Sequence, residues 1–355
     1  MVVGWGNINF EEYGILSGFQ TNGVVMISNH ILTNAVAVSP GSMSSLAVLE
    51  NGDVVGWGRN GWGQANNLPS KEIMGTNGPV VFNGLPLTDV IAVAAGNTYC
   101  LALRKDGTVL TWGGSPDVKG NIGAEVLGPK GMRNIKAIAA GDERSLILKE
   151  DGTVAVFGDG NSAPKGLTNI ISIAAGVGGW GREDAALKRD GTVVTWNVRG
   201  IPGQQARQPE GMSNIVAISA GGAHILALQD NGTVWGWGYN RNGEATGEPT
   251  ELNRSAARII NSGKVLDNKS AIAAGKNQLA AGVVRINGKV LDDVSAIAAG
   301  YRCSLALKKD GTLVFWGDDD EGRMRPPADL SGVVAIALSD SQGLAITTNK
   351  AVLSR

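Results

Sequence analysis

Residues 90–113 read VIAVAAGNTYCLALRKDGTVLTWG, and the chain repeats this stretch with variations. It returns as IKAIAAGDERSLILKEDGTVAVFG from Ile135, as VAISAGGAHILALQDNGTVWGWG from Val216 and as SAIAAGYRCSLALKKDGTLVFWG from Ser295. A unit that recurs along a chain specifies an array of stacked structural units rather than one globular core. The sequence therefore predicts a repeat architecture.

Each unit contains three apolar runs separated by turn residues. In the copy from Val90 the first run ends at Gly96, the second covers Leu101–Leu103, and an Asp-Gly pair at 106–107 precedes a third run that ends in Trp112. Asp-Gly or Asn-Gly between hydrophobic runs is a strong hairpin signal, because both residues tolerate positive φ. We expect three strands per unit, with a fourth strand or a loop leading onward, and we expect the repeated tryptophans to pack in the core or between units.

The glycine that ends the first run marks each unit. Its copies lie at Gly41, Gly96, Gly141, Gly176, Gly221, Gly275 and Gly300, with a degenerate copy near Ser339. Most intervals suit the roughly 40–50 residues of a four-stranded propeller blade. The interval from Gly275 to Gly300 is too short for a blade, so we expect one irregular blade at about residues 245–290. The prediction is seven blades, with eight as the alternative, in a single β-propeller domain over residues 1–355.

Both ends of the chain carry incomplete units. Val2–Gly6 matches a third strand without a hairpin before it, and the hairpin over Val333–Thr347 precedes a shortened third strand, Ala351–Arg355. The first strand can complete the last blade, which removes the open sheet edges that invite aggregation. We expect an all-β propeller closed by pairing of the N- and C-terminal strands; a repeat array cut at an arbitrary boundary is the alternative.

Composition argues against several classes of partner. The chain has 31 basic and 32 acidic residues and a net charge of −1, which gives no electrostatic case for nucleic acid or an anionic membrane. No apolar run is long enough for a membrane span, and no signal-peptide pattern is visible. Localisation therefore stays open, with a secreted mature form included. Cys100 and Cys303 are too few for a disulfide framework and fall where a small buried residue is expected.

Residues for catalysis or metal binding are scarce. The two histidines, His30 and His224, give little material for a metal cluster or a Ser-His-Asp arrangement. The acidic run Asp318–Glu321 lacks the ligand spacing of a calcium loop and fits a solvated inter-strand loop better. We expect no cofactor, no metal and no catalytic residue. Carboxylates from different blades that met near the axis would instead indicate a carbohydrate-active enzyme.

The pattern AAG-x-x-x-S/C-L-A-L-x-x-D/N-G-T-V-x-x-W-G resembles the repeat of the regulator-of-chromosome-condensation family. The resemblance covers residues 2 to about 347 and implies a seven-bladed β-propeller. Proteins that the resemblance would make relatives of this chain include guanine nucleotide exchange factors for a small GTPase, a plant UV-B photoreceptor and a bacterial propeller-type β-lactamase inhibitory protein. Compact blades and short loops make this chain most similar in style to the last, and that style favours a bacterial origin.

Residues that break a repeat are the candidates for recognition, because the repeat itself fixes the scaffold. We expect a monomeric, non-enzymatic module that binds another protein as an inhibitor, effector or receptor-binding protein does. The alternatives are a carbohydrate-binding protein or carbohydrate-active enzyme, and then a guanine nucleotide exchange factor. The candidate binding residues are Tyr99, Asp142, Glu143, Arg144, Trp180, Arg182, Glu183, His224, Tyr301, Arg302, Trp62, Tyr239 and Arg241. Trp62, Tyr239 and Arg241 lie after the third strand, which can belong to another face of the ring.

Overall fold

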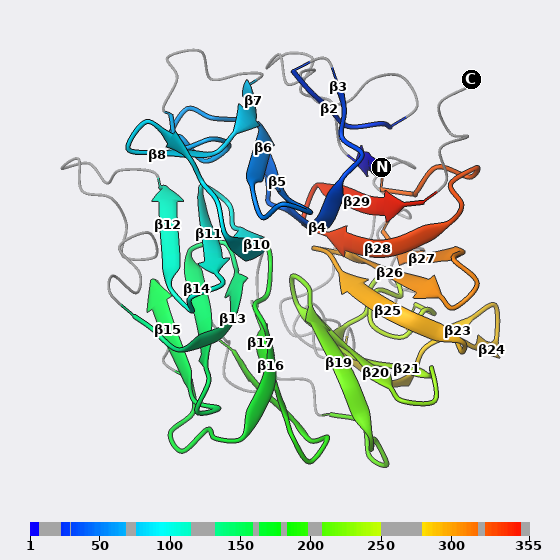
Figure 1. Cartoon of the computed structure of the whole chain (residues 1–355). Helices are drawn as coiled ribbons and strands as arrows, with labels where there is room; N and C mark the ends of the chain where they lie inside the picture. The colour runs from blue at the N-terminus through cyan, green and yellow to red at the C-terminus, as the bar shows by residue number, and fades with distance from the viewer. Residues whose placement is uncertain are drawn as a thin grey trace, which may run out of the picture.

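A computed structural model describes residues 1–6, 23–28, 30–68, 76–114, 132–158, 163–178, 183–197, 208–249, 279–318 and 324–348. These residues form β-strands joined by turns, without a helix. Nothing in these ranges is a long apolar helix of the kind that crosses a membrane. Within them, seven sheets of three or four strands are arranged as the blades of a propeller (Figure 1).

The first strand of each blade lies on the inside of the ring. The inner strands are β4 (Ala35–Pro40), β10 (Val90–Ala95), β13 (Ile135–Ala140), β16 (Ile170–Ala174), β19 (Ile215–Ala220), β25 (Val294–Ala299) and β28 (Val333–Leu338). Each of them contacts the inner strand of the next blade, and β28 contacts β4. The described inner strands therefore form a closed circuit around a central axis.

The other strands of a blade follow outward, each antiparallel to the one before. The second strands are β5 (Ser44–Leu49), β11 (Tyr99–Arg104), β14 (Arg144–Lys149), β17 (Glu183–Lys188), β20 (His224–Gln229), β26 (Cys303–Lys308) and β29 (Gln342–Thr347). The third strands are β6 (Val54–Gly58), β12 (Val109–Gly113), β15 (Val154–Gly158), β18 (Val193–Asn197), β21 (Val234–Tyr239), β27 (Leu313–Gly317) and β1 (Val2–Gly6). Fourth strands are β7 (Thr76–Pro79) and β22 (Leu279–Val283). Three short hairpins join blades: β2–β3 (Met26–Ile27, His30–Ile31), β8–β9 (Val81–Phe82, Leu85–Pro86) and β23–β24 (Arg285–Ile286, Lys289–Val290).

The repeated Asp-Gly and Asn-Gly pairs form the turns between second and third strands, as predicted. Their glycines have φ between 75 and 90°. The residue before the glycine is not left-handed; in the turn after β11, the Asp106 carboxylate accepts the backbone N–H of Thr108 at 2.9 Å. In these turns only the glycine has a left-handed conformation. The aspartate or asparagine before it instead stabilises the turn by accepting a backbone N–H with its side chain.

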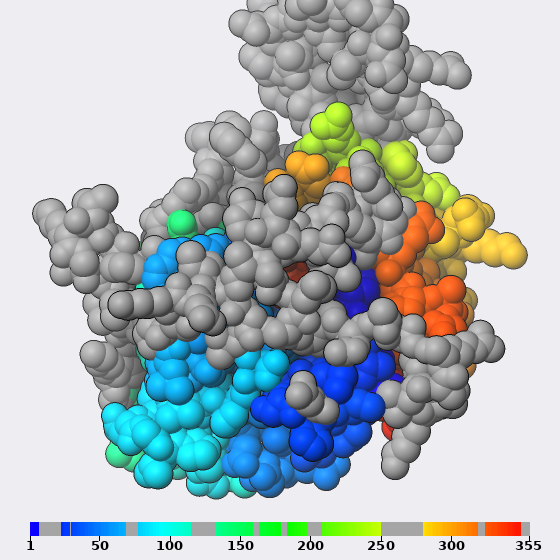
Figure 2. Space-filling view, turned by 90° about the horizontal axis from the view of Figure 1, so that it is seen from above, coloured from blue at the N-terminus to red at the C-terminus, as the bar shows by residue number. Residues whose placement is uncertain are grey.

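The N-terminal strand belongs to the last blade. β1 pairs antiparallel with β29, from Val2 opposite Ile346 to Gly6 opposite Gln342. In the space-filling view the blue N-terminal part lies between the cyan second blade and the orange last blades (Figure 2). The first and last described strands of the chain thus share one sheet.

The repeated tryptophans lie in the core and between blades, as expected. Trp57, Trp112 and Trp237 are among the largest fully buried side chains. The Nε1 atom of Trp112 donates to the carbonyl of Gln64 in the preceding blade at 3.1 Å. Trp316 donates to the carbonyl of Glu244 in the same way at 3.0 Å. The Trp-Gly ending of the repeat therefore joins one blade to its neighbour.

The marker glycines pack against one another at one end of the inner strands. A Cβ atom on Gly41 would lie 2.4 Å from the carbonyl oxygen of Gly96, and one on Gly96 would lie 2.7 Å from that of Gly141. Each later marker glycine approaches the carbonyl oxygen of the next marker residue in the same way, and the series runs through Gly176, Gly221 and Gly300 to Ser339. These positions need glycine because of close approach between blades. We call this end of the propeller the glycine face.

The irregular blade predicted at about residues 245–290 is described only in part. Residues 279–283 form β22 and residues 285–290 form the β23–β24 hairpin, whereas residues 250–278 lie outside the described ranges. The extent of that blade, and the assignment of residues 1–355 to one domain, stay predictions.

Candidate functional site

Four predicted binding residues at the start of second strands are buried. Tyr99, Arg144 and His224 have 0% exposed surface, and Glu183 has 5%. The cause is their place in the blade, since the first residue of a second strand packs against the next blade. These side chains are therefore not available to a partner, contrary to the sequence-based prediction.

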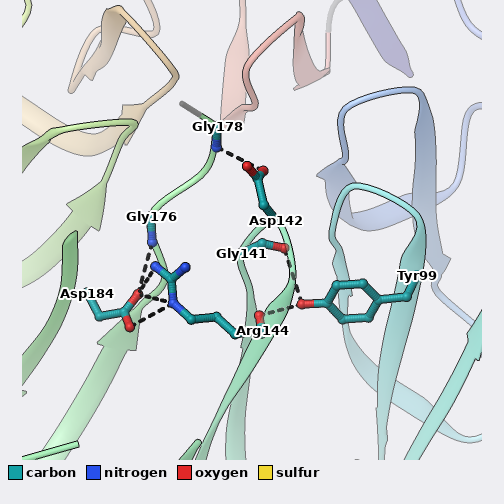
Figure 3. Close-up of polar contacts among 7 residues, drawn as sticks. All are labelled: Tyr99, Gly141, Asp142, Arg144, Gly176, Gly178 and Asp184. Atoms are coloured by element: carbon teal, nitrogen blue, oxygen red, sulfur yellow. Dashed lines mark hydrogen bonds and ion pairs between the residues drawn. The ribbon is translucent and has the colours of Figure 1, made fainter. Parts of the chain in front are cut away.

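Instead, such residues hold neighbouring blades together (Figure 3). The Tyr99 hydroxyl donates to the Gly141 carbonyl at 3.2 Å and also lies within hydrogen-bond distance of the Arg144 carbonyl. Arg144 Nη2 lies 2.6 Å from Asp184 Oδ1, and both side chains are fully buried. The N–H of Gly176 donates to the same carboxylate at 3.3 Å. Residues that break the sequence repeat here thus form specific links between blades.

The same position links blades elsewhere in the ring. His224 Nε2 lies 2.8 Å from the hydroxyl oxygen of Ser304, and Gln342 Nε2 donates to the Gly41 carbonyl at 2.8 Å. Burial lowers the pKa of His224 to about 3, so the imidazole is neutral at physiological pH.

Three further candidates lie on loops of the glycine face. Asp142 is also buried, and its Oδ1 accepts the N–H of Gly178 at 2.9 Å. Glu143 is half-buried. Trp62 is half-buried, and the guanidinium of Arg59 lies over its ring at 4.7 Å from the centroid. Trp180 and Arg182 lie outside the described residues.

Loops after the third strands emerge on the glycine face as well. The backbone N–H of Tyr239 donates to the Ala223 carbonyl at 2.7 Å, and that of Asp318 donates to the Arg302 carbonyl at 2.9 Å. In an antiparallel blade the first and third strands end at the same edge, which explains this shared position. The loop after the third strand therefore does not belong to another face. The candidates that the structure brings to this face without burying them are Trp62, Glu143, Tyr239, Arg241, Tyr301 and Arg302; Asp142 lies on the same face but is buried.

A cleft of about 240 Å³ opens on the glycine face between two blades. Its lining residues are Tyr239, Arg241, Asn242, Arg302 and Asp318. Asn242 Nδ2 donates to Asp318 Oδ2 at 3.2 Å, and Arg302 Nη1 lies 3.8 Å from the same oxygen. The Arg302 guanidinium also lies over the ring of Tyr301, 4.9 Å from its centroid. We call this site the Arg302 cleft; one blade supplies residues 239–242 and the next supplies Arg302 and Asp318.

Glu244 lies beside the cleft and is 1% exposed. Its Oε2 accepts the N–H of Asn242 at 2.7 Å, whereas Oε1 is buried and has no hydrogen-bond partner among the described residues. Burial, with a smaller contribution from nearby Asp318, raises the pKa of Glu244 to about 7 against the opposing effects of backbone hydrogen bonds and of Arg302. The carboxyl group therefore changes its charge near neutral pH.

The loop that carries Glu244 has a twin in the first complete blade. Residues 59–67 read RNGWGQANN and residues 239–247 read YNRNGEATG. In both loops the asparagine, Asn60 or Asn240, accepts two backbone N–H groups with its Oδ1 atom. Gln64 stands where the second loop has Glu244, and its Oε1 accepts the N–H of Trp62 at 3.0 Å.

Sequence reasoning missed Asn242, Asp318 and Glu244 as parts of the site. The signal for Asn242 and Glu244 was the duplicated N-x-x-G-Q/E-A pattern of the twin loops. In the sequence, Asp318 stands out only as the start of the acidic run Asp318–Glu321, which fits a solvated loop. Its place in the cleft depends on the packing of two blades.

The lining chemistry suits binding. Guanidinium, phenol, amide and carboxylate groups converge, and Tyr and Arg are enriched among residues that dominate binding energy. Within the described part of the chain, no group of three or more His, Cys, Asp or Glu side chains is placed to hold a metal ion.

Comparison with known proteins supports the repeat assignment. Residues 90–117, 135–163 and 215–244 match the family model described as "Regulator of chromosome condensation (RCC1) repeat". The structure of Prp20p from Saccharomyces cerevisiae has a TM-score of 0.66 to this chain at 18% identity, covering 99% of this chain and 92% of that one. A structure of the yeast protein bound to Kap60 has a TM-score of 0.68 at 18% identity, with 99% and 90% coverage.

Sequence similarity reaches parts of much longer proteins. The human protein named "Probable E3 ubiquitin-protein ligase HERC6" is 29% identical over 233 residues, which is 61% of this chain and 19% of that protein. The chain thus spans about a fifth of that relative. These relatives are human and yeast proteins, and a bacterial origin stays a prediction.

Proposed function

Because the chain is a β-propeller built from regulator-of-chromosome-condensation repeats, we propose that it is a non-enzymatic module that binds another protein through its glycine face. The observation that carries the proposal is the Arg302 cleft, where Tyr239, Arg241 and Arg302 from two blades line one recess. Aromatic and arginine side chains around a recess are typical of binding hot spots.

The structural relatives support a protein partner. Yeast Prp20p is described with binding properties to Gsp1p and histones, and the second structure holds the yeast protein bound to Kap60. These partners belong to the yeast protein. The shared fold supports a protein as the class of partner for this chain. The residues that line the Arg302 cleft of this chain would determine which protein it binds.

The experiment compares capture of partners by the wild-type protein and by a Tyr239→Ala/Arg302→Ala variant. Tyr239 is half-buried and Arg302 exposed, so the double variant should keep the melting temperature within about 2 °C of wild type, as expected for surface changes. A matched control is Ile91→Ser, at an exposed residue of inner strand β10 near the end opposite Gly96. We expect the cleft variant to lose a partner that the Ile91 variant retains. Equal capture by all three proteins would contradict the proposal.

Carbohydrate binding is the second candidate, because the same cleft combines an aromatic ring with amide, carboxylate and guanidinium groups. The aromatic ring can stack on a sugar ring, and the amide, carboxylate and guanidinium groups can form hydrogen bonds with the sugar hydroxyls. A glycan array distinguishes the two: binding that Tyr239→Ala abolishes would favour the glycan. The third candidate, nucleotide exchange on a small GTPase, is tested by release of a fluorescent nucleotide across a panel of GTPases.

A further inference from the structure

We propose that the protein forms a two-fold symmetric dimer through the face opposite the glycine face, with a second copy of this chain as the partner. We call this side the turn face, because the inner strands begin there beside the Asp-Gly and Asn-Gly turns. The N–H of Val90, at the start of β10, donates to the carbonyl of Gly52 in such a turn at 3.0 Å. The dimer takes the place of the monomer expected from the sequence and leaves the Arg302 cleft open.

The second residue of each inner strand is exposed on the turn face. In all seven blades the pairing of the inner strand with the second strand shifts between the first and third residues. Such a bulge leaves the residue between them unpaired and re-aims its side chain. Val36, Ile91, Val216 and Val334 occupy this position and are 51 to 56% exposed. They are four of the seven large hydrophobic side chains exposed in the described part of the chain, so the exposure belongs to the position.

These bulge residues form an apolar arc around part of the ring. We number the blades 1 to 7 by their inner strands, in chain order from β4 to β28. Blades 7, 1 and 2 are neighbours, because β4 contacts both β28 and β10, and all three carry exposed apolar bulge residues. From blade 7 around the ring to blade 6, the bulge residues are Val334, Val36, Ile91, Lys136, Ile171, Val216 and Ser295. An exposed apolar arc bordered by polar residues is typical of a protein–protein contact.

The order of the bulge residues is symmetric about blade 1. In either direction from Val36 the next three are apolar, polar and apolar. A two-fold axis through blade 1, in the plane of contact, pairs blade 2 with blade 7 of the second copy, blade 3 with blade 6, and blade 4 with blade 5. It places Ile91 opposite Val334 and Lys136 opposite Ser295, while Val36 meets its own copy. An axis through any other blade pairs at least one apolar residue with a polar one. An isologous contact requires this self-complementarity.

Charged residues at the start of the inner strands follow the same symmetry. The second residue before the inner strand is exposed Arg133 in blade 3 and exposed Asp292 in blade 6, and it is serine or threonine in the other five blades. Because the axis pairs blade 3 with blade 6, each arginine meets an aspartate of the second copy. Opposite charges at symmetry-related positions favour one register of the contact over the others.

The turns are complementary as well. Residues 149–151 of blade 3 carry a net charge of −1 and residues 308–310 of blade 6 carry +1. Residues 188–190 of blade 4 carry +1 and residues 229–231 of blade 5 carry −1. Both pairs of turns therefore attract across the axis. Glu50 of blade 1, which meets its own copy, is the like-charged exception.

A variant on the axis tests whether this face forms the contact. Val36→Lys brings two like charges together, one from each copy, and Lys136 shows that a lysine fits this position of an inner strand. The variant should therefore keep its fold and its melting temperature. Leu68→Lys is the matched control, because Leu68 is 52% exposed and lies on the loop after β6, toward the glycine face.

Sedimentation equilibrium measures the dissociation constant of the dimer at protein concentrations of about 1 to 100 µM. We expect wild type and Leu68→Lys to dimerise reversibly in this range, and Val36→Lys to raise the dissociation constant by about tenfold or more. A wild-type protein that stays monomeric at about 100 µM would overturn the proposal and would assign the apolar arc to a partner other than this chain. A dimer that Val36→Lys leaves unchanged would overturn it as well.

A charge swap tests the register of the two copies. Arg133→Asp and Asp292→Arg should each weaken the dimer several-fold, because each brings like charges together across the axis. The double variant Arg133→Asp/Asp292→Arg should return the dissociation constant to within about twofold of wild type. A double variant that dimerises no better than the single variants would overturn the two-fold axis through blade 1.

The dimer and the proposed function fail separately. Sedimentation of the purified chain involves no other protein, so its outcome does not bear on capture of a partner by the Tyr239 and Arg302 side chains. A crosslink between two copies contains this chain alone and has twice its mass, which distinguishes it from a crosslink to a partner protein.

Discussion

Replacement of Glu244 by glutamine is expected to change how the stability of the propeller depends on pH. In the folded protein the pKa of Glu244 is about 7, against an ordinary value of 4.5. Between these two values the folded chain holds a proton that the unfolded chain has released. Stability from this group is therefore fully present below pH 4.5 and is lost as the pH rises through 7.

The magnitude follows from the size of the shift. A difference of about 2.5 units, at 1.36 kcal/mol per unit, corresponds to about 3 kcal/mol of unfolding free energy. Glutamine does not ionise, so the variant escapes this loss. Because pH 5 already lies above the ordinary value of 4.5, Glu244→Gln should gain roughly 2–3 kcal/mol relative to wild type at pH 8 compared with pH 5, or about 3 °C in melting temperature for a chain of this length.

The assay is urea unfolding of both proteins at pH 5 and pH 8, followed by tryptophan fluorescence. Glu183 titrates in the same range but is present in both proteins, so its contribution cancels in the difference. A free-energy difference between variant and wild type that is equal at the two pH values would refute the burial argument for Glu244.

Three other predictions concern the links between blades. Arg144→Met removes the arginine that is paired with the buried Asp184 carboxylate and should lower the free energy of unfolding in urea by about 3–5 kcal/mol. The double variant Arg144→Met/Asp184→Leu should recover part of this loss. An unchanged midpoint of urea unfolding in Arg144→Met would argue against a stabilising link between the two blades. Gly41→Ala places a Cβ atom 2.4 Å from a backbone oxygen and should cost about 1–3 kcal/mol or more, whereas Gly282→Ala, with open space around it, should change stability little. Because burial lowers its pKa to about 3, the His224 imidazole should stay neutral at pH 5 in an NMR titration. The contribution of the neutral imidazole to the free energy of unfolding is present above pH 6.5 and is lost as the pH falls below that value. A protonation midpoint near 6.5 would contradict the burial of His224.

The architecture could be predicted because it is encoded locally and many times. Asp-Gly turns, apolar runs and the Trp-Gly ending each specify one part of a blade, and their recurrence specifies the ring. The pairing of Val2–Gly6 with β29 also followed from local signals, since a third strand without a hairpin has an unpaired edge. Repetition amplifies such signals, and the fold follows from them.

The site was predicted only in part because it depends on contacts between repeats. Tyr99 and Arg144 stand out in sequence in the same way as Tyr301 and Arg302. Only the packing of neighbouring blades shows that the first two are buried between blades and that Arg302 is exposed. A residue that departs from a repeat can thus serve the scaffold as readily as a partner, and single-sequence patterns do not separate the two uses.

The most direct test of a protein-binding glycine face is site-specific photo-crosslinking. A photoreactive amino acid would replace Tyr239 in the Arg302 cleft in one protein, and exposed Ile91 on inner strand β10 in another. We predict that the Tyr239 position crosslinks to a partner protein, that excess unlabelled wild type competes this product away, and that the Ile91 position gives no such product. A competable crosslink from the Ile91 position alone would contradict the assignment of binding to the glycine face.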